Sequence, residues 1–392
     1  MRILSIETSC DETAISIVEA TGDFPVATYE VLGNALFSQI DIHKEFGGVF
    51  PTVAKREHIK TVVPMLKQAL SEANLLEERS SRSELELEQK EKLAALLEHE
   101  AGLADELIVF TETYDLPEIH LIAVTSGPGL EPALWVGVNF AKALALLANA
   151  PVVPTNHMEG HIYASLFDIV EDNMLAQIVF PAISLLISGG HTELVLMRNW
   201  LHFEKVGQTK DDAVGEAFDK VARMMGLSYP GGPEVSKRAK LARHESLPPF
   251  KADMPRPMLH SGDLDFSFSG IKTAVKYSIA EKELSEDEKN ALARDFEDAV
   301  TEVLLKKVAT ALSQFGAGTL IVGGGVSANT FIRDTFTKEL LASHPNVELY
   351  FPQPKLSTDN SLMIALAGHA HVAQARTAGA INLMKADGNW SL

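Results

Sequence analysis

One order of elements occurs twice along the chain, and this duplication limits the folds open to it. Apolar, β-branched runs from Arg2 to Thr8 and from Ala14 to Ala20 flank a short polar turn. A similar pair of runs, Ala182 to Ser188 and Thr192 to Met197, flanks a glycine turn. Two short runs joined by a turn of this kind predict a β-hairpin. We therefore expect two halves that each begin with a hairpin.

A βαβ-like unit follows each hairpin. The first reads "LIAVTSGPGL", then a helix-like stretch at 132–148, then "APVVPTNH", which ends at His157. The second reads "LIVGGGVSAN", then a helix-like stretch at 330–342, then "VELYFPQPKLSTDN", whose polar end contains Asp359. Parallel βαβ units carry their functional loops at the carboxyl ends of the strands. His157 and Asp359 therefore occupy equivalent places in the two halves, and they converge if the halves face one another across a cleft.

The composition is that of a globular protein. The 392 residues are 46% hydrophobic and 22% charged, and this length favours two or more lobes. Cys10 is the single cysteine, which excludes an internal disulfide and fits a reducing compartment. The N-terminus does not resemble a secretory signal. The longest uncharged run, 173–192, contains Pro181 and a Gly-Gly pair, so it reads as a buried strand and loop. We expect a cytoplasmic protein with no membrane association.

The formal net charge of −19 argues against non-specific binding to nucleic acid, because attraction to phosphate needs a basic face. A local basic strip is nevertheless present. The run "SKRAKLAR", at 236–243, has four basic residues and no acidic one, and Lys251 and Arg256 follow it. Such a strip suits RNA contact, although a solvated helix face is the favoured interpretation. Phe266 and Phe268 could stack on a base, but their alternation in a strand favours core packing.

A charged insertion lies in the first half, at about 77–117. From Glu77 to Glu100 there are eight Glu against two Arg and two Lys, with leucines spaced as in helices. The pattern predicts a helical hairpin broken near Gly102. We favour a solvated appendage, and a docking surface for another chain is the alternative.

The stretch "TNHMEGHIYASL" contains a histidine pair at helical spacing. Residues i and i+4 lie on one helix face, so His157 and His161 can hold one metal ion. A third ligand must come from elsewhere, and Asp359 is the candidate. Two ordinary histidines are the alternative. The position of Glu159 excludes a metalloprotease. In the metalloprotease motif the general base directly follows the first histidine, whereas Glu159 is turned about 200° from His157 around the helix.

Several glycine turns follow apolar strands, which suits close approach of a nucleotide to the backbone. "ISGGHTE" and "IVGGGVSANT" match neither the dinucleotide-binding nor the P-loop pattern, and Gly232 lies in a further turn, "LSYPGGPEVSK". Tight turns without a ligand are the alternative. Asp219 can bind a ribose hydroxyl or pair with Arg223 four residues on, and Asn329 can bind a ligand or cap the next helix.

Together these motifs carry a family resemblance. "IETSCDET", "NHMEGH", "LLISGGHTEL", "DDAVGEAFDKVARMMGLSYPGGP", "LDFSFSGIKTA", "DFEDAV", "GGGVSAN" and "STDNSLMIALAG" closely resemble the tRNA N6-adenosine threonylcarbamoyltransferase family, the TsaD type, once described as a glycoprotease. The resemblance runs from Met1 to about Ala378, apart from the insertion.

The resemblance implies an actin-like (ASKHA) α/β fold of two lobes. The expected divisions are a first lobe at 1–155, which carries the insertion, a second at 156–358, and a C-terminal helix at 359–392 that returns to the first lobe. The implied reaction moves a threonylcarbamoyl group from L-threonylcarbamoyladenylate to N6 of adenosine 37 in tRNAs that read codons beginning with A. Implied partners are tRNA and, in bacteria, a TsaB-type paralogue and a TsaE-type ATPase.

The resemblance also implies a site. His157, His161 and Asp359 would hold one divalent metal ion, Fe²⁺ first and Zn²⁺ second. Asp11 lies in the first hairpin turn and is our candidate to accept the proton lost from N6, with Glu12 second. The residues implied to bind the adenylate are Leu186, Ile187, Ser188, Gly189, Gly190, Asp219, Gly232 and Asn329.

The chain departs from the family pattern at Asn156, where a histidine is frequent, and at Glu131 and Pro132, where small residues are usual. Two other functions stay open from the sequence. An actin-like-fold kinase or ATPase shares the glycine turns but gives no reason for three converging metal ligands. A non-catalytic paralogue that serves as an assembly platform should have lost one of those ligands, and none is lost.

Overall fold

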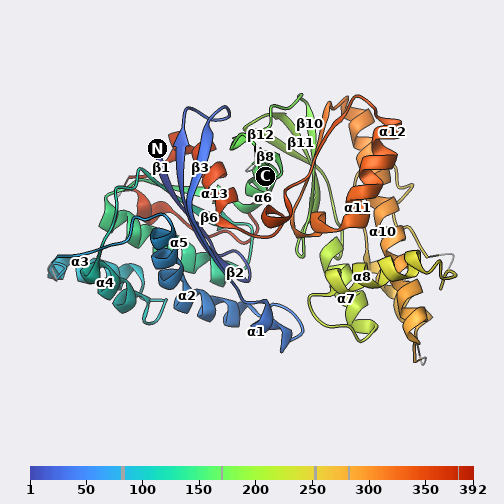
Figure 1. The fold of residues 1–392 in the computed structure, drawn as a ribbon, viewed down its shortest axis with the longest axis horizontal. Helices are drawn as coiled ribbons and strands as arrows, with labels where there is room; N and C mark the ends of the chain where they lie inside the picture. Colours follow the sequence, from blue (N-terminus) through green and yellow to red (C-terminus); the bar gives the residue numbers. More distant parts are fainter. Residues whose placement is uncertain (81–83, 169–170, 251–253, 281–282, 378) are drawn as a thin grey trace. The chain divides into compact units, whose positions relative to one another are not determined.

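The structure is a computed structural model that describes residues 1–80, 84–168, 171–250, 254–280, 283–377 and 379–392 (Figure 1). The chain divides into two compact units. Unit 1 comprises Met1–Leu175 and Asp359–Ser391, and unit 2 comprises Ala176–Thr358 with Leu392.

Unit 1 is built on a sheet with strand order β7-β6-β1-β2-β3-β9-β8. The hairpin strands β1 and β2 pair antiparallel, β3 extends them, and β6 and β7 run parallel to β1. The first hairpin and the first βαβ unit predicted from the sequence are thus confirmed. The strands are β1 (Arg2–Glu7), β2 (Glu12–Thr21), β3 (Thr28–Ser38), β6 (Leu121–Gly127), β7 (Val152–Asn156), β8 (Phe167–Asp168) and β9 (Met174–Leu175).

Helices cover both faces of this sheet. Strand residues such as Leu4, Ile6 and Ile15 pack with α2 and α5 in one buried core, because alternate side chains of a strand point to the same face. The opposite face packs against α13, which begins just after Asp359, and α6 lies beside α13. The helices are α1 (Ile40–Lys44), α2 (Pro51–Glu72), α5 (Glu131–Ala148), α6 (His157–Leu166) and α13 (Ser361–Ala370).

The insertion forms the predicted helical hairpin. A two-stranded ladder of β4 (Glu77–Glu78) and β5 (Tyr114–Asp115) closes it, and α3 (Leu87–Leu96) and α4 (Leu103–Thr113) meet at Gly102, whose φ of +87° suits glycine. The expectation of a solvated appendage is wrong for its inner face. Leu93, Leu97, Leu103, Leu107 and Phe110 are buried in the core of unit 1, each contributing about 1.5–3 kcal/mol.

Unit 2 has the strand order β12-β11-β10-β13-β14. This is the order β3-β2-β1-β6-β7 again, with the same antiparallel and parallel pairs, so the predicted duplication is confirmed. The strands are β10 (Ala182–Ile187), β11 (Thr192–Asn199), β12 (His202–Gln208), β13 (Thr319–Gly323) and β14 (Glu348–Tyr350). The helices are α7 (Val214–Met224), α8 (Gly231–His244), α9 (Ser269–Ser278), α10 (Glu286–Phe315), α11 (Thr330–Thr335) and α12 (Leu341–Ser343).

The division into units differs from the boundary expected after residue 155. The segment 156–175 belongs to unit 1, because α6 continues directly from β7 and packs against α13. Gly160 permits this contact, since a Cβ at that position would lie 3.1 Å from Met363 Cγ and 3.3 Å from its carbonyl oxygen.

One helix among the described residues, α5, is long and apolar enough to cross a membrane by length and composition. It is 67% buried within the protein, as the core helix of a globular unit is. The uncharged run at 173–192 instead contains the buried strand β10 and its turn, as predicted.

Candidate active site

Three potential metal ligands come together in unit 1. His157 is the first residue of α6, His161 lies one turn later, and Asp359 directly precedes Asn360, the N-cap of α13. Asp359 Oδ1 lies 3.4 Å from His157 Nε2 and 3.1 Å from His161 Nε2, and the three ligand atoms all lie within 4.8 Å of one another. The cluster lies wholly in unit 1, so the expectation that each half supplies part of it is wrong.

Local capping fixes where the two helices begin. Asn156 Oδ1 accepts hydrogen bonds from the backbone N–H groups of Met158 and Glu159, and Asn360 Oδ1 accepts one from Met363 N–H. Asparagine is a favoured N-cap because it satisfies donors that the first turn leaves free. The departure at Asn156 therefore has a structural role, and it leaves both histidine ligands in place.

The separations in the cluster fit one ion. Ligand atoms at about 2.0–2.2 Å from a metal, at angles near 90–110°, stand about 3.0–3.5 Å apart. The distances from Asp359 Oδ1 to the two imidazole nitrogens fall in this range. Two neutral imidazoles and one carboxylate suit iron or zinc and leave coordination positions for substrate.

Sequence reasoning missed one residue beside this cluster. Glu7, at the end of β1, is fully buried, and its Oε2 lies 3.1 Å from His157 Nδ1. Thr125 Oγ1 donates to the same oxygen at 2.6 Å, and Ser9 N–H donates to Oε1 at 2.5 Å. The signal was available, because a carboxylate inside an apolar strand is costly unless it has partners.

The charged forms of His157 and Asp359 stabilise each other. Burial disfavours the charged form of His157, but the carboxylates of Asp359 and Glu7 prevail and raise the pKa of His157 well above its usual value. Burial would raise the pKa of Asp359, but His157 and then His161 hold the pKa of Asp359 well below its usual range. An anionic pocket of this kind attracts a cation.

Asp11 and Glu12 form a second acidic pair in unit 1. They are only 8% and 9% exposed, and Ser38 Oγ donates to Glu12 Oε1. Burial raises the pKa of Asp11, and the negative charge of Asp359 raises it further. A hydrogen bond with Glu12 lowers the pKa of Asp11 by less than burial raises it. Burial and the charges of Asp11 and Asp359 raise the pKa of Glu12 further. Both carboxyl groups are therefore harder to ionise than exposed ones.

In unit 2, the predicted adenylate residues fall into two groups. The side chains of Leu186 and Ile187 are fully buried, so only their backbone is available to a ligand. The turn that follows them is different. Ser188 Oγ accepts from Gly190 N–H and His191 N–H, and the exposed Gly189 and Gly190 have open space where a Cβ would lie.

Asp219, Gly232 and Asn329 stabilise neighbouring turns of unit 2. Asp219 Oδ1 accepts from Gly231 N–H at 2.7 Å and so fixes the start of α8, where Gly232 also has open space. Asn329 caps α11 through Ile332 N–H, and its amide donates to Ser236 and Glu297. The capping alternative for Asn329 is thus confirmed.

The core packing favoured for Phe266 and Phe268 is confirmed in unit 2. Both side chains are fully buried and stack on each other with ring centroids 6.1 Å apart, so neither can receive a base. In the basic strip, Arg238 pairs with Glu286, Arg243 pairs with Glu297 and Asp298, and Arg256 pairs with Glu302. Lys237 and Lys240 remain exposed, and Lys251 lies outside the described residues.

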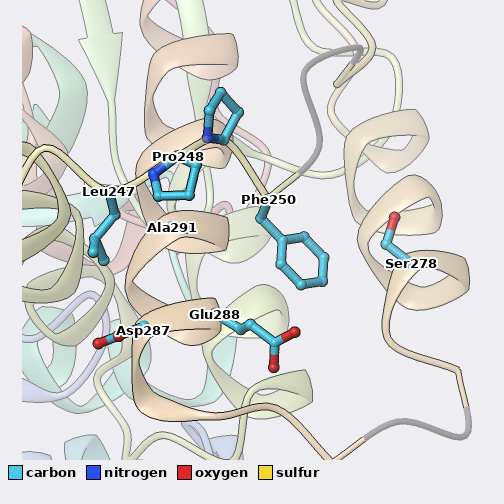
Figure 2. Close-up of a pocket in the computed structure, with 8 residues that line it drawn as sticks. Leu247, Pro248, Phe250, Ser278, Asp287, Glu288 and Ala291 are labelled. Carbon is cyan, nitrogen blue, oxygen red and sulfur yellow. The ribbon is translucent and has the colours of Figure 1, made fainter.

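Unit 2 also has a cavity of about 590 Å³ beside α10 (Figure 2). None of the predicted metal, catalytic or adenylate residues lines it. Its lining residues are Leu247, Pro248, Pro249, Phe250, Ser278, Asp287, Glu288 and Ala291.

The chain is similar to known transferases. Residues 30–80 and 104–366 match the family model described as "TsaD: tRNA N6-adenosine threonylcarbamoyltransferase". The tRNA N6-adenosine threonylcarbamoyltransferase of Polynucleobacter necessarius subsp. necessarius (strain STIR1) is 39% identical over 378 residues, 94% of this chain and 91% of the relative. The protein of that name from Staphylococcus aureus (strain Newman) is 39% identical over 379 residues, 96% and 93% of the two chains. Among solved structures, a ROK hexokinase from Thermus thermophilus has a TM-score of 0.45 at 12% identity, covering 95% of this chain and 100% of that one.

The two sheets of equal strand order define a duplicated α/β protein, the architecture that the family resemblance implied, and the His-His-Asp cluster gives unit 1 a candidate metal centre. The family match covers most of the chain. The chain therefore belongs to the tRNA N6-adenosine threonylcarbamoyltransferase family, and it is a transferase that acts on N6 of adenosine in tRNA. The kinase or ATPase alternative is thereby set aside. The unmatched residues 81–103 contain α3, so the part of the insertion foreign to the family is shorter than expected.

Proposed function

We propose that the chain transfers the threonylcarbamoyl group of L-threonylcarbamoyladenylate to N6 of adenosine 37 in tRNAs that read codons beginning with A. The observation that carries the proposal is the cluster of the buried His157 and His161 with the half-buried Asp359, whose spacing fits one divalent ion. We expect Fe²⁺ first and Zn²⁺ second. The ion would supply Lewis-acid stabilisation of negative charge that develops on the donor.

Residues of the chain would carry out the proton transfer that accompanies attack on the donor. The donor is a mixed anhydride of a carbamic acid and AMP, so attack on its carbonyl carbon forms the N6–carbonyl bond and releases AMP. Adenine N6 is a poor nucleophile and must lose a proton. Asp11 is the proposed acceptor, because its buried carboxylate is more basic than an exposed one.

Binding of the adenylate is proposed for unit 2. Gly189, Gly190 and Gly232 have the open backbone that close approach of a phosphate or ribose requires. Leu186 and Ile187 would contribute only main-chain atoms, and Asp219 and Asn329 would support the turns rather than serve chiefly as ligands. The partners we expect are tRNA, a TsaB-type paralogue and a TsaE-type ATPase, in the cytoplasm.

A reconstitution assay tests the proposal. Purified protein, L-threonylcarbamoyladenylate and unmodified tRNA are incubated with and without the partner proteins, and modified adenosine is quantified by mass spectrometry. We expect His161→Ala to lower transfer at least about 100-fold, because a buried ligand is lost. His99→Ala, at a side chain 77% exposed in the insertion, is the matched control and should leave transfer unchanged.

Removal of metal with a chelator should abolish transfer, and Fe²⁺ or Zn²⁺ should restore it. Full activity of His161→Ala, or of the chelated protein, would contradict the metal proposal. Release of ADP from ATP with a phosphorylated acceptor, and no modified tRNA, would contradict the proposed reaction.

A further inference from the structure

The candidate metal ligand His157 has a buried carboxylate behind it. Glu7 is 0% exposed, and its Oε2 lies 3.1 Å from His157 Nδ1, while His157 Nε2 lies 3.4 Å from Asp359 Oδ1. The imidazole is therefore in contact with a carboxylate through each of its two nitrogens. One nitrogen belongs to the proposed ligand cluster and the other does not.

The orientation of Glu7 does not depend on His157. Thr125 Oγ1 donates to Oε2 at 2.6 Å, and Ser9 N–H donates to Oε1 at 2.5 Å. Glu7 ends β1 and Thr125 lies in β6, two paired strands in the middle of the unit 1 sheet. Oε2 is thus held from a paired strand and Oε1 from the turn that follows β1, which fixes the carboxylate as an orienting group for a ligand requires.

This arrangement selects one tautomer of the imidazole. Asp359 belongs to the candidate ligand cluster and would itself face the ion together with Nε2, so the proton of neutral His157 belongs on Nδ1, facing the acceptor Glu7. Nε2 then presents its lone pair toward His161 and Asp359. Only this tautomer can donate that lone pair to a metal ion.

We propose that Glu7 is a positioning residue for the metal centre: it fixes the tautomer and ring orientation of His157 and so raises the affinity of the cluster for a divalent cation. The inference rests on the metal site of the proposed function. Ser9 Oγ, 3.2 Å from the same Nδ1, is a weaker alternative acceptor, so loss of Glu7 weakens binding rather than abolishing it.

The test is the affinity of the metal-free full-length chain for Zn²⁺, measured by competition with a chromophoric chelator. Glu7→Gln keeps the shape of the side chain, but its amide can donate to Nδ1 and so favours the tautomer that cannot ligate. We expect Zn²⁺ affinity to fall about 10–100-fold. Glu7→Asp keeps an acceptor at a longer distance and should give an intermediate loss.

Glu100→Gln is the matched control, since Glu100 is equally buried in unit 1 but bonds Asn139 in the core rather than a ligand. It should bind Zn²⁺ within about two-fold of the parent. Should Glu7→Gln fail to fold by circular dichroism, Thr125→Val replaces it. That variant removes one hydrogen bond to Glu7, and we expect an affinity loss of about three- to ten-fold.

Two results would overturn the inference, and only the second would also overturn the proposed metal site. Equal Zn²⁺ affinity of the parent and Glu7→Gln, with binding lost in His161→Ala, would show that the metal site exists and that Glu7 does not position it. Equal affinity of the parent and His161→Ala would show that the cluster itself is not the metal site, which would overturn the metal proposal as well.

Discussion

Three carboxylates of the first hairpin differ in chemistry because their neighbours differ. Glu7 is surrounded by donors from Ser9, Thr125 and His157, which favours a fixed acceptor. Asp11 and Glu12 instead face each other and the charge of Asp359, which makes both harder to ionise. A carboxylate with an elevated pKa is a stronger base once ionised. Asp11 and Glu12 therefore suit proton transfer better than Glu7 does.

Asp11→Asn should lower the rate of transfer about 100- to 10,000-fold, because the amide cannot accept the proton from N6. Glu12→Gln is the matched comparison. Its amide can donate a hydrogen bond to Asp11 and leaves the proposed acceptor in place, so we expect activity within about ten-fold of the parent. Single-turnover transfer measures both variants, and calorimetric titration with a non-reactive adenylate analogue should give unchanged affinity for each. If Glu12→Gln proves less active than Asp11→Asn, the two roles are assigned the wrong way round.

At the scale of elements, α6 and α13 pack together next to the candidate metal ligands, which lie in α6 and just before α13. Gly160 lets the helices approach closely, and Glu159, buried on the side of α6 away from the ligands, accepts from His371 Nε2 at 2.8 Å just past the end of α13. Tyr163 also donates to Glu159. The hydrogen bond to Glu159 raises the pKa of His371, against the effect of burial.

His371→Gln should destabilise the protein in a pH-dependent way. Because the folded-state pKa of His371 lies above its unfolded value of about 6.5, the contribution is complete below that pH and is lost as pH rises through the folded-state pKa. We expect a loss of about 1–3 kcal/mol at pH 6 and a smaller loss at pH 9. Urea unfolding of the metal-free protein, followed by tryptophan fluorescence, measures it. The exposed His99→Gln is the control, and a loss that grows with pH would contradict the assignment.

The sequence could predict features that depend on residues close together in the chain, and it missed contacts between residues far apart in the chain. The hairpins, the βαβ units and the His157–His161 spacing are local patterns, and the structure has them where expected. Glu7 was missed because its partner His157 is distant in sequence and only the sheet brings them together. The buried face of the insertion was missed for a similar reason. Leucines such as Leu107 pack with α2 and α5, which charge counting along the insertion cannot reveal.

For the molecule as a whole, the net charge of −19 has to be reconciled with an RNA substrate. Much of the basic strip is already neutralised, because Arg238 and Arg243 bind carboxylates of α10. An arginine that is paired in the folded protein must break that pair to reach a phosphate. Lys237 and Lys240 are the exposed cations of α8, so few phosphates can be contacted there.

The isolated chain should therefore bind unmodified tRNA weakly, with a Kd above about 1 μM at about 0.15 M salt, and partner proteins should supply most of the affinity. With two or three phosphates contacted, the slope of log K against log salt should lie near −2 to −3. Fluorescence anisotropy of labelled tRNA between about 50 and 200 mM salt gives both quantities. Replacing Lys237 and Lys240 by alanine should flatten the slope, whereas Lys338→Ala, at a side chain 82% exposed elsewhere in unit 2, should not. Nanomolar affinity of the chain alone, with a slope of −6 or steeper, would mean that a basic surface other than α8 carries the RNA.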